Sequence, residues 1–272
     1  MPNWCANNMV VQGKGEVVKQ FIQENFKTDR NPWCKEGEYE YKYILDFEQF
    51  DPTPTDEDGK IINDWYNWRL QHWGCKWSPS YEQCISLCME KEGEPVNIIY
   101  DDGRLQECNF TEELIRDLDA ECYMKLELQC YFETPWGPPE GIFMQWYEKY
   151  KELDLEVSIK FYEPGVIFAG EIWFSKEGYC LKFIDDSDRK EWVEYLLKEG
   201  WEDIEWYIEE CYDMIREMHS EEIADKLILK IEETLCKAKD AQAATLIADI
   251  MDKYMEWLHK PEGDESSESS EE

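Results

Sequence analysis

Apolar and polar residues alternate along two stretches of the chain, and this alternation predicts β-strands. In residues 122–132 and 155–161, every second side chain is apolar. Successive side chains of a strand point to opposite faces of a sheet, so a period of two indicates a sheet with one covered face. Further strands are predicted over residues 3–12, 41–50, 97–100, 166–174 and 179–184.

Helices are predicted where apolar residues recur three and four positions apart. This spacing covers residues 16–25 and 65–73, and a further helix begins at Pro138, because proline is tolerated in the first helical turn. We expect Gly74 to end the helix over residues 65–73, and Thr111 to cap a further, short helix. The order strand, helix, strand, strand in the second half predicts a ferredoxin-like α+β fold, an antiparallel sheet with helices on one face.

The chain changes character at Ser187, after which apolar residues follow helical spacing. We therefore expect a ferredoxin-like α+β domain over residues 1–186, with an insertion at about 78–118, and a helical domain over residues 187–260. Residues 261–272 are almost all Gly, Ser, Asp and Glu, which predicts a disordered acidic tail. The helices either form a homo-oligomer or docking element or close on the sheet domain, and the sequence does not separate these alternatives.

The chain is strongly acidic, with 63 Asp and Glu against 28 Lys and Arg in 272 residues and a formal net charge of -35. Residues 187–272 hold 26 of these acids, so the acidity is spread over both halves. Such a chain repels nucleic-acid phosphates and anionic membranes at long range. The charge therefore favours a protein partner with a basic surface, and it disfavours nucleic acid and membranes.

The sequence also indicates a compartment. Its start lacks a basic segment followed by an apolar run, and no stretch approaches the roughly 18 apolar residues that cross a bilayer. The 11 cysteines are odd in number and scattered, which favours reduced thiols over disulfides. We expect a cytoplasmic protein, in the host cytoplasm if a phage encodes it.

Residues with catalytic or metal-binding chemistry are dispersed. The three histidines form no zinc-ligand spacing, and neither a phosphate-binding glycine loop nor a nucleophile elbow occurs. Glu163 and Glu171 could pair for acid–base work, but residues 162–165 also have the sequence of a turn, in which proline presets φ and glycine allows a positive φ. The turn is the favoured interpretation, and we expect no catalytic residue, metal or cofactor.

Tryptophans recur between residues 65 and 77. They are Trp65, Trp68, Trp73 and Trp77. A platform for nucleic-acid bases would interleave exposed rings with Lys and Arg, but the nearby cations are only Arg69 and Lys76. Buried rings with hydrogen-bonded indoles are therefore the favoured interpretation.

Four stretches occur in order along the chain: MPNWCANN, NWRLQHWGCKWS, YFETPWGPPEG and FYEPGVIFAGE. Together they resemble the YubB-type ferredoxin-like proteins of conjugative plasmids and phages, over about residues 1–185. The resemblance implies a ferredoxin-like fold and a mobile-element origin, and it implies no established catalytic activity. One departure is Cys75, which stands where threonine is more usual in that family.

The shared positions supply candidate binding residues. They are Trp4, Asn7, Trp73, Lys76, Trp77, Trp136, Glu163 and Gly165. Within MPNWCANN, we expect Trp4 and Cys5 to face the core. We expect Asn7 or Asn8 to satisfy backbone groups where strands meet.

The leading functional hypothesis is a non-enzymatic binding protein of a phage or mobile element. Its carboxylates would imitate DNA phosphates and block a host protein with a basic surface, such as a defence or nucleic-acid-handling enzyme. The alternative is a ferredoxin-like module that binds single-stranded nucleic acid through exposed aromatic rings. A third hypothesis is an enzyme with Glu163 and Glu171 as paired carboxylates.

Overall fold

The computed structural model describes residues 3–35, 40–91, 94–101, 110–123, 125–165, 168–185, 195–196 and 198–201. The chain divides into two compact units, Met1–Phe183 and Ile184–Glu272. The first unit is almost fully described. The predicted helical domain lies almost wholly outside the described residues, and the acidic tail lies entirely outside them.

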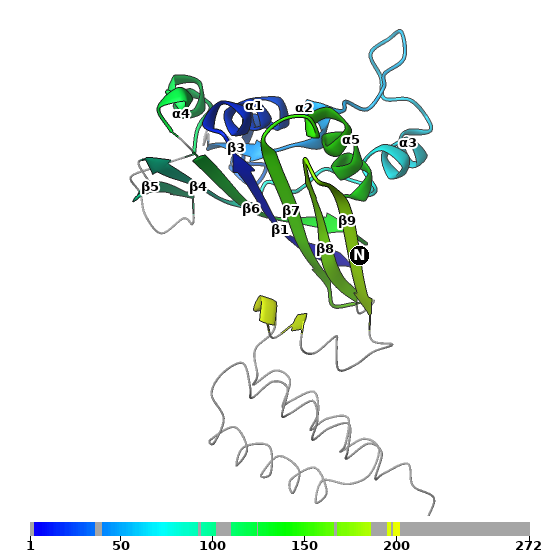
Figure 1. Cartoon of the computed structure of the whole chain (residues 1–272). Coiled ribbons are helices and arrows are strands. Elements are labelled where there is room, and N and C mark those ends of the chain that lie inside the picture. The colour runs from blue at the N-terminus through cyan, green and yellow to red at the C-terminus, as the bar shows by residue number, and fades with distance from the viewer. Residues whose placement is uncertain are drawn as a thin grey trace, which may run out of the picture. The chain divides into compact units, whose positions relative to one another are not determined.

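The first unit is built on a seven-stranded antiparallel sheet with the order β5-β4-β6-β1-β7-β8-β9 (Figure 1). Its strands, in chain order, are β1 Trp4–Gly13, β4 Cys84–Lys91, β5 Glu94–Asp101, β6 Lys125–Pro135, β7 Leu155–Glu163, β8 Phe168–Ser175 and β9 Gly178–Asp185. β1 pairs with β6 on one side and with β7 on the other. The first strand of the chain therefore lies at the centre of the sheet.

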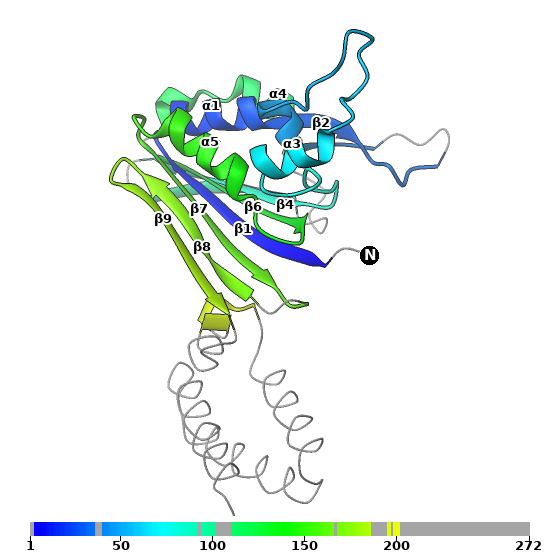
Figure 2. The ribbon, with the colours of Figure 1, turned by 90° about the vertical axis from the view of Figure 1, so that its right-hand side faces the viewer.

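The helices lie on one face of this sheet (Figures 1 and 2). They are α1 Gly15–Asn25, α2 Phe47–Phe50, α3 Trp65–His72, α4 Glu112–Asp117 and α5 Glu140–Tyr150, with a 3-10 turn, η1, at Ala120–Cys122. Two short strands, β2 Phe26–Arg30 and β3 Tyr41–Leu45, form a separate sheet. The fold is thus α+β, with a large antiparallel sheet and few helices, as predicted.

Three parts of the sequence prediction are corrected. The predicted strand over residues 41–50 ends at Leu45. The Asp46 side chain then accepts a hydrogen bond from the backbone N–H of Glu48 at 2.9 Å, and this N-cap starts the helix α2. β2 was not predicted. The segment assigned to an insertion contributes β4 to the main sheet, where it pairs with β6.

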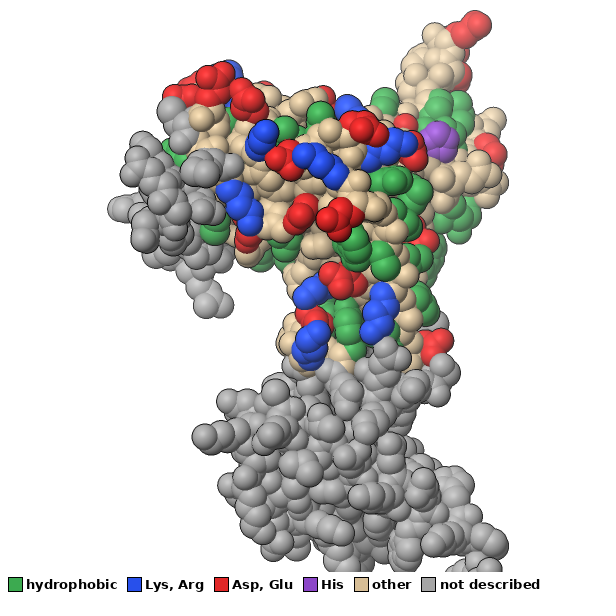
Figure 3. All heavy atoms as spheres, in the orientation of Figure 1, with side chains coloured by type: hydrophobic (Ala, Val, Ile, Leu, Met, Phe, Trp, Pro, Cys, Tyr) green, Lys and Arg blue, Asp and Glu red, His purple; other side chains and the backbone are tan. Residues whose placement is uncertain are grey.

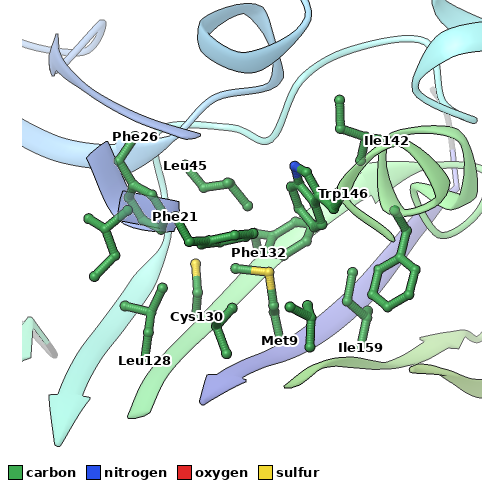
Figure 4. Close-up of a cluster of buried hydrophobic side chains, with 14 of the residues drawn as sticks. Met9, Phe21, Phe26, Leu45, Leu128, Cys130, Phe132, Ile142, Trp146 and Ile159 are labelled. Carbon is green, nitrogen blue, oxygen red and sulfur yellow. The ribbon is translucent and has the colours of Figure 1, made fainter. Parts of the chain in front are cut away.

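Alternation along the strands separates a core face from an open face. On β6, the side chains that face the helices are buried, whereas Lys125, Glu127 and Gln129 point to the other face. Figure 4 shows Met9, Cys130 and Ile159 pointing from the strands toward Phe21 and Trp146 of the helices. The Phe21 and Trp146 rings meet edge to face at 5.2 Å, an arrangement that aromatic pairs prefer.

Candidate functional site

Segments far apart in the sequence meet at the N-terminal end of β1. Trp4 lies opposite Pro135 in the β1–β6 register, and the backbone N–H of Trp136 donates to the carbonyl of Asn3 at 2.9 Å. The Trp77 ring centroid lies 6.5 Å from that of Trp4 and 6.3 Å from that of Trp136. Trp77 therefore joins a cluster of three tryptophans. They come from three of the four stretches quoted above: MPNWCANN, NWRLQHWGCKWS and YFETPWGPPEG.

The loop that carries Trp77 is held by close backbone contact between α3 and α5. Gly74 follows α3 with a φ of +83°, a conformation that glycine adopts without strain. A Cβ atom at Gly74 would lie 2.8 Å from the backbone nitrogen of Glu140, and one at Gly141 would lie 2.6 Å from the carbonyl oxygen of His72. Only glycines allow this approach, and it brings the Lys76–Trp77 segment against the β6–α5 connection.

Trp136 has an unusual backbone conformation. Its φ of +67° lies in the left-handed region, which is rare for a bulky residue. Such strain costs about 1–3 kcal/mol and persists only where surrounding contacts impose it. Here the Trp136 N–H bonds to Asn3, and the Thr134 hydroxyl donates to the Gly137 carbonyl at 2.7 Å. The strained turn directs the Trp136 ring onto Trp77.

Lys76 lies among these rings. Its Nζ is 4.1 Å from the Trp77 ring centroid, 5.5 Å from that of Trp136 and 5.8 Å from that of Tyr66 on α3. Trp4 is 40% exposed, Tyr66 39% and Trp136 44%. We call Trp4, Tyr66, Lys76, Trp77 and Trp136 the aromatic site. It presents large aromatic surface to solvent around one ammonium group.

Asn7 supports this site from the core. Its Nδ2 donates to the carbonyl of Cys5 at 2.8 Å, to that of Phe132 at 3.3 Å and to the Thr134 hydroxyl at 2.9 Å. The side chain is fully buried, so Asn7 itself presents no surface to a ligand. Asn7 thus binds backbone groups where strands meet, as expected, and it holds Thr134 in position.

Glu163 and Gly165 form the turn that follows β7. Glu163 is fully buried, and one of its carboxylate oxygens accepts a hydrogen bond from the Gly165 N–H at 3.1 Å. A Cβ atom at Gly165 would lie 2.5 Å from Nδ2 of Asn3, so this turn packs against the start of β1. The turn interpretation of residues 162–165 is confirmed.

The paired-carboxylate hypothesis is wrong. Glu163 lies on the helix-covered face of β7, in phase with Ile159 and Phe161. Glu171 is out of phase with the buried Ile172 and Phe174 of β8, and it therefore points to the open face. The two carboxylates lie on opposite sides of the sheet and cannot act on one substrate.

Two expectations for individual tryptophans need revision. Trp4 was expected to face the core, but Cys5 takes that direction, so strand alternation turns Trp4 outward. In the group Trp65 to Trp77, only Trp73 is fully buried. Its indole N–H donates to the carbonyl of Asp51 at 3.0 Å, so Trp73 is a core residue and does not belong to the aromatic site.

The sequence interpretation did not identify a polar network beside α3. His72 Nδ1 lies 2.9 Å from Asp51 Oδ2, and the His72 ring stacks on Trp68 with centroids 3.9 Å apart. A carboxylate can orient an imidazole for proton transfer. Within the described part of the chain, no Ser, Thr or Cys side chain hydrogen-bonds His72, so no nucleophile accompanies it. The only sequence signal was the position of Asp51 at the start of a loop.

The core cysteines are protonated thiols. Burial raises the pKa of Cys75 to about 12, and it also raises the pKa of Cys5 and Cys130 far above the ordinary value. A thiolate is the nucleophilic form of cysteine, so these three side chains act as small apolar residues.

Comparison with protein-family models, curated proteins and solved structures finds no match to the chain. No group of three or more His, Cys, Asp or Glu among the described residues is placed to hold a metal ion. Within the same residues, no helix has the length and apolar character needed to cross a membrane.

Proposed function

We propose that the protein is a non-enzymatic, anionic binding protein of a phage or mobile element, which engages and inhibits a host protein with a basic surface. The observation that carries the proposal is the aromatic site, in which Lys76 lies against the exposed rings of Tyr66 and Trp136 and the partly buried ring of Trp77, in a chain of net charge -35. Exposed tryptophan and tyrosine are the residues that most often dominate protein interfaces.

Charge and aromatic rings would contribute to binding at different distances. The acidic surface attracts a basic partner at long range and accelerates encounter. Figure 3 shows one part of that surface, where acidic side chains crowd over α4, which contributes Glu112, Glu113 and Asp117. The aromatic rings would then supply the short-range contact that makes one basic partner preferred over others.

We further propose a ferredoxin-like fold and a mobile-element origin for the protein. The order β4-β6-β1-β7, with α1 after β1 and α5 between β6 and β7, supports a ferredoxin-like arrangement that β5, β8 and β9 enlarge. The four motif stretches support membership of the YubB-type proteins, because three of them supply aromatic-site residues and the fourth packs against Asn3. The protein would then act in the host cytoplasm.

One observation favours the nucleic-acid alternative. The Trp77 and Trp136 rings are nearly parallel, with 27° between their planes, and Lys76 lies beside them. Proteins that bind single-stranded nucleic acids use aromatic rings, on which the bases stack, beside cationic side chains. The net charge opposes this function, since each approaching phosphate is repelled by the chain as a whole.

Affinity capture from host lysate tests the proposal. The immobilised full chain is compared with Trp136→Gly, which removes a ring at a backbone conformation that glycine tolerates, and with Trp33→Leu, a control at an outlying tryptophan that is 77% exposed. We expect the wild type and the control to retain a basic protein at low salt, and Trp136→Gly to retain much less. That protein's activity should fall when the wild type is added. If no protein distinguishes the wild type from Trp136→Gly, the proposal is wrong.

A further inference from the structure

The aromatic site already holds a cation. Rings from three separate segments, Tyr66, Trp77 and Trp136, lie within 6 Å of the Lys76 ammonium. We propose that this site is a receptor for a cationic side chain of the partner, preferably the guanidinium of arginine, and that Lys76 occupies it in the free protein. The inference rests on the proposed function and names the group that the partner inserts.

The geometry meets the requirement for cation–π binding. A cation within about 6 Å of a ring centroid is attracted by the negative face of the ring, and tryptophan gives the strongest attraction. Lys76 satisfies this distance for three rings at once. The intramolecular ammonium thus shows that the site accepts a positive group, while the exposed parts of Trp4 and Trp136 leave room for another contact.

Lys76 is placed to be exchanged. Among the described residues, no carboxylate lies within 4 Å of its Nζ, so no ion pair there holds it against the rings. Its four-carbon stem is flexible, and its ammonium regains full hydration when it swings into water. The contacts that Lys76 loses are therefore ones that an incoming cation replaces.

Arginine suits the site better than lysine does. A guanidinium is planar and weakly hydrated, so it stacks flat on an indole with a smaller desolvation cost. The same molecule contains guanidinium–indole contacts at cation–π distance, since Arg69 Cζ lies 4.7 Å from the Trp73 ring centroid and 5.0 Å from that of Trp65. The overall negative charge favours either cation, so the planar stacking decides between them.

Removing the charge of Lys76 affects binding affinity differently in each alternative, in direction or in size. If Lys76 competes with a partner's cation, removing its charge strengthens binding of that cation. If Lys76 instead contacts phosphates, removing its charge weakens binding. If the acidic surface binds basic partners by charge alone, Lys76→Met only changes the net charge from -35 to about -36, and it strengthens binding slightly.

Calorimetric titration of the full chain with blocked octa-arginine, octa-lysine and oligo(dT) tests the inference. We expect Lys76→Met to bind octa-arginine about fivefold more tightly than the wild type, and Trp136→Gly to bind it about fivefold less tightly. Tyr66→Leu gives a second loss of affinity should Trp136→Gly fold poorly, and Trp33→Leu serves as the control that binds as the wild type does. Octa-arginine should bind more tightly than octa-lysine.

The other outcomes contradict the inference in different ways. Equal affinity of all variants for octa-arginine would overturn the receptor and leave the proposed anionic binding protein intact. Absence of octa-arginine binding would overturn both. Oligo(dT) binding by the wild type that Lys76→Met weakens would overturn both and establish a nucleic-acid site.

Discussion

Asn7 is a fully buried amide on the core face of the central strand, between Cys5 and Met9. Its three hydrogen bonds all use the Nδ2 donor group. Asn7→Asp replaces that donor with a carboxylate oxygen, which would face the carbonyl oxygens of Cys5 and Phe132 and must be desolvated. We expect a loss of about 3 kcal/mol in the free energy of unfolding, measured by urea denaturation.

The neighbouring residue supplies the control for that experiment. Asn8 is exposed on the opposite face of β1, so Asn8→Asp should change the stability by less than about 0.5 kcal/mol. Similar losses for the two variants would show that the buried hydrogen bonds of Asn7 are not what the sheet depends on.

The conformation of Trp136 makes a second prediction at the residue scale. At a φ of +67°, an alanine retains the steric cost of the left-handed region and a glycine does not. Both substitutions remove the ring, so their difference isolates the backbone. Trp136→Gly should be more stable than Trp136→Ala by about 1 kcal/mol in thermal or urea unfolding. Equal stability of the two variants would mean that the backbone at this position relaxes out of the left-handed region.

At the scale of elements, alternation predicts a strand only where one face is covered and the two residue classes are distinct. β6 meets both conditions, and the strand predicted over residues 122–132 is present, although it begins and ends three residues later, at Lys125–Pro135. In β4, the open-face positions include Cys84 and Cys88, which count as apolar, so the buried Ile85 and Leu87 do not stand out. The apolar cysteines on the open face therefore masked this strand in the sequence, and its pairing with β5 is further interrupted by a register shift between Leu87 and Met89.

The aromatic site was predictable in composition and unpredictable in arrangement. The recurring stretches identified Trp4, Lys76, Trp77 and Trp136 as candidates. Their convergence depends on the β1–β6 register and on the contact between Gly74 and Gly141, neither of which local sequence determines. Tyr66 was not among the predicted site residues, because only the tryptophans of its helix were considered as candidates.

Two helices that cover the sheet are joined by an acid-sensitive link. Glu24 of α1 accepts hydrogen bonds from Lys149 Nζ, at 2.8 Å, and from the Tyr150 hydroxyl of α5. Partial burial alone would raise the pKa of Glu24, but the hydrogen bonds from Lys149 and Tyr150 outweigh it and lower the pKa below the ordinary 4.5. The folded protein therefore favours the ionised carboxylate more than the unfolded chain does.

The direction of that shift gives a pH dependence. A lowered folded pKa contributes stability that is present above the ordinary value of 4.5 and lost as the pH falls through the folded value. The wild type should therefore exceed Glu24→Gln in stability at neutral pH, and this margin should shrink as the pH falls below 4.5. Urea titrations at a series of pH values measure it, with Glu82→Gln at an exposed position as the control. A margin independent of pH would refute the assignment.

At the scale of the whole molecule, the distribution of cysteines reports on integrity of the fold. Cys5, Cys75 and Cys130 are buried, whereas Cys84 and Cys180 are exposed. Iodoacetamide should modify the two exposed thiols quickly and the three buried ones only after unfolding, because alkylation requires an accessible thiolate. Peptide mass spectrometry follows each site. Rapid modification of Cys75 in the native protein would contradict the packing of the loop that carries Lys76 and Trp77.

In the proposed function, the acidity of the whole chain and the aromatic site would act together on one basic partner. Charge alone gives attraction to any basic surface, with strong salt dependence. Aromatic rings that accept a cation also require that the cation reach them in a suitable position. Salt screens this short-range contact less than it screens the long-range attraction. A cationic ligand that binds in this way must contact these particular tryptophans.

Fluorine NMR of the full chain labelled with 5-fluorotryptophan tests that claim most directly, with resonances assigned by single substitutions. On titration with blocked octa-arginine, the signals of Trp4, Trp77 and Trp136 should shift together and saturate with one dissociation constant, while the signal of Trp33 stays in place. Shifts of Trp33 equal to those of the aromatic site, or no shift of Trp136 at saturation, would contradict binding of a cation at the aromatic site.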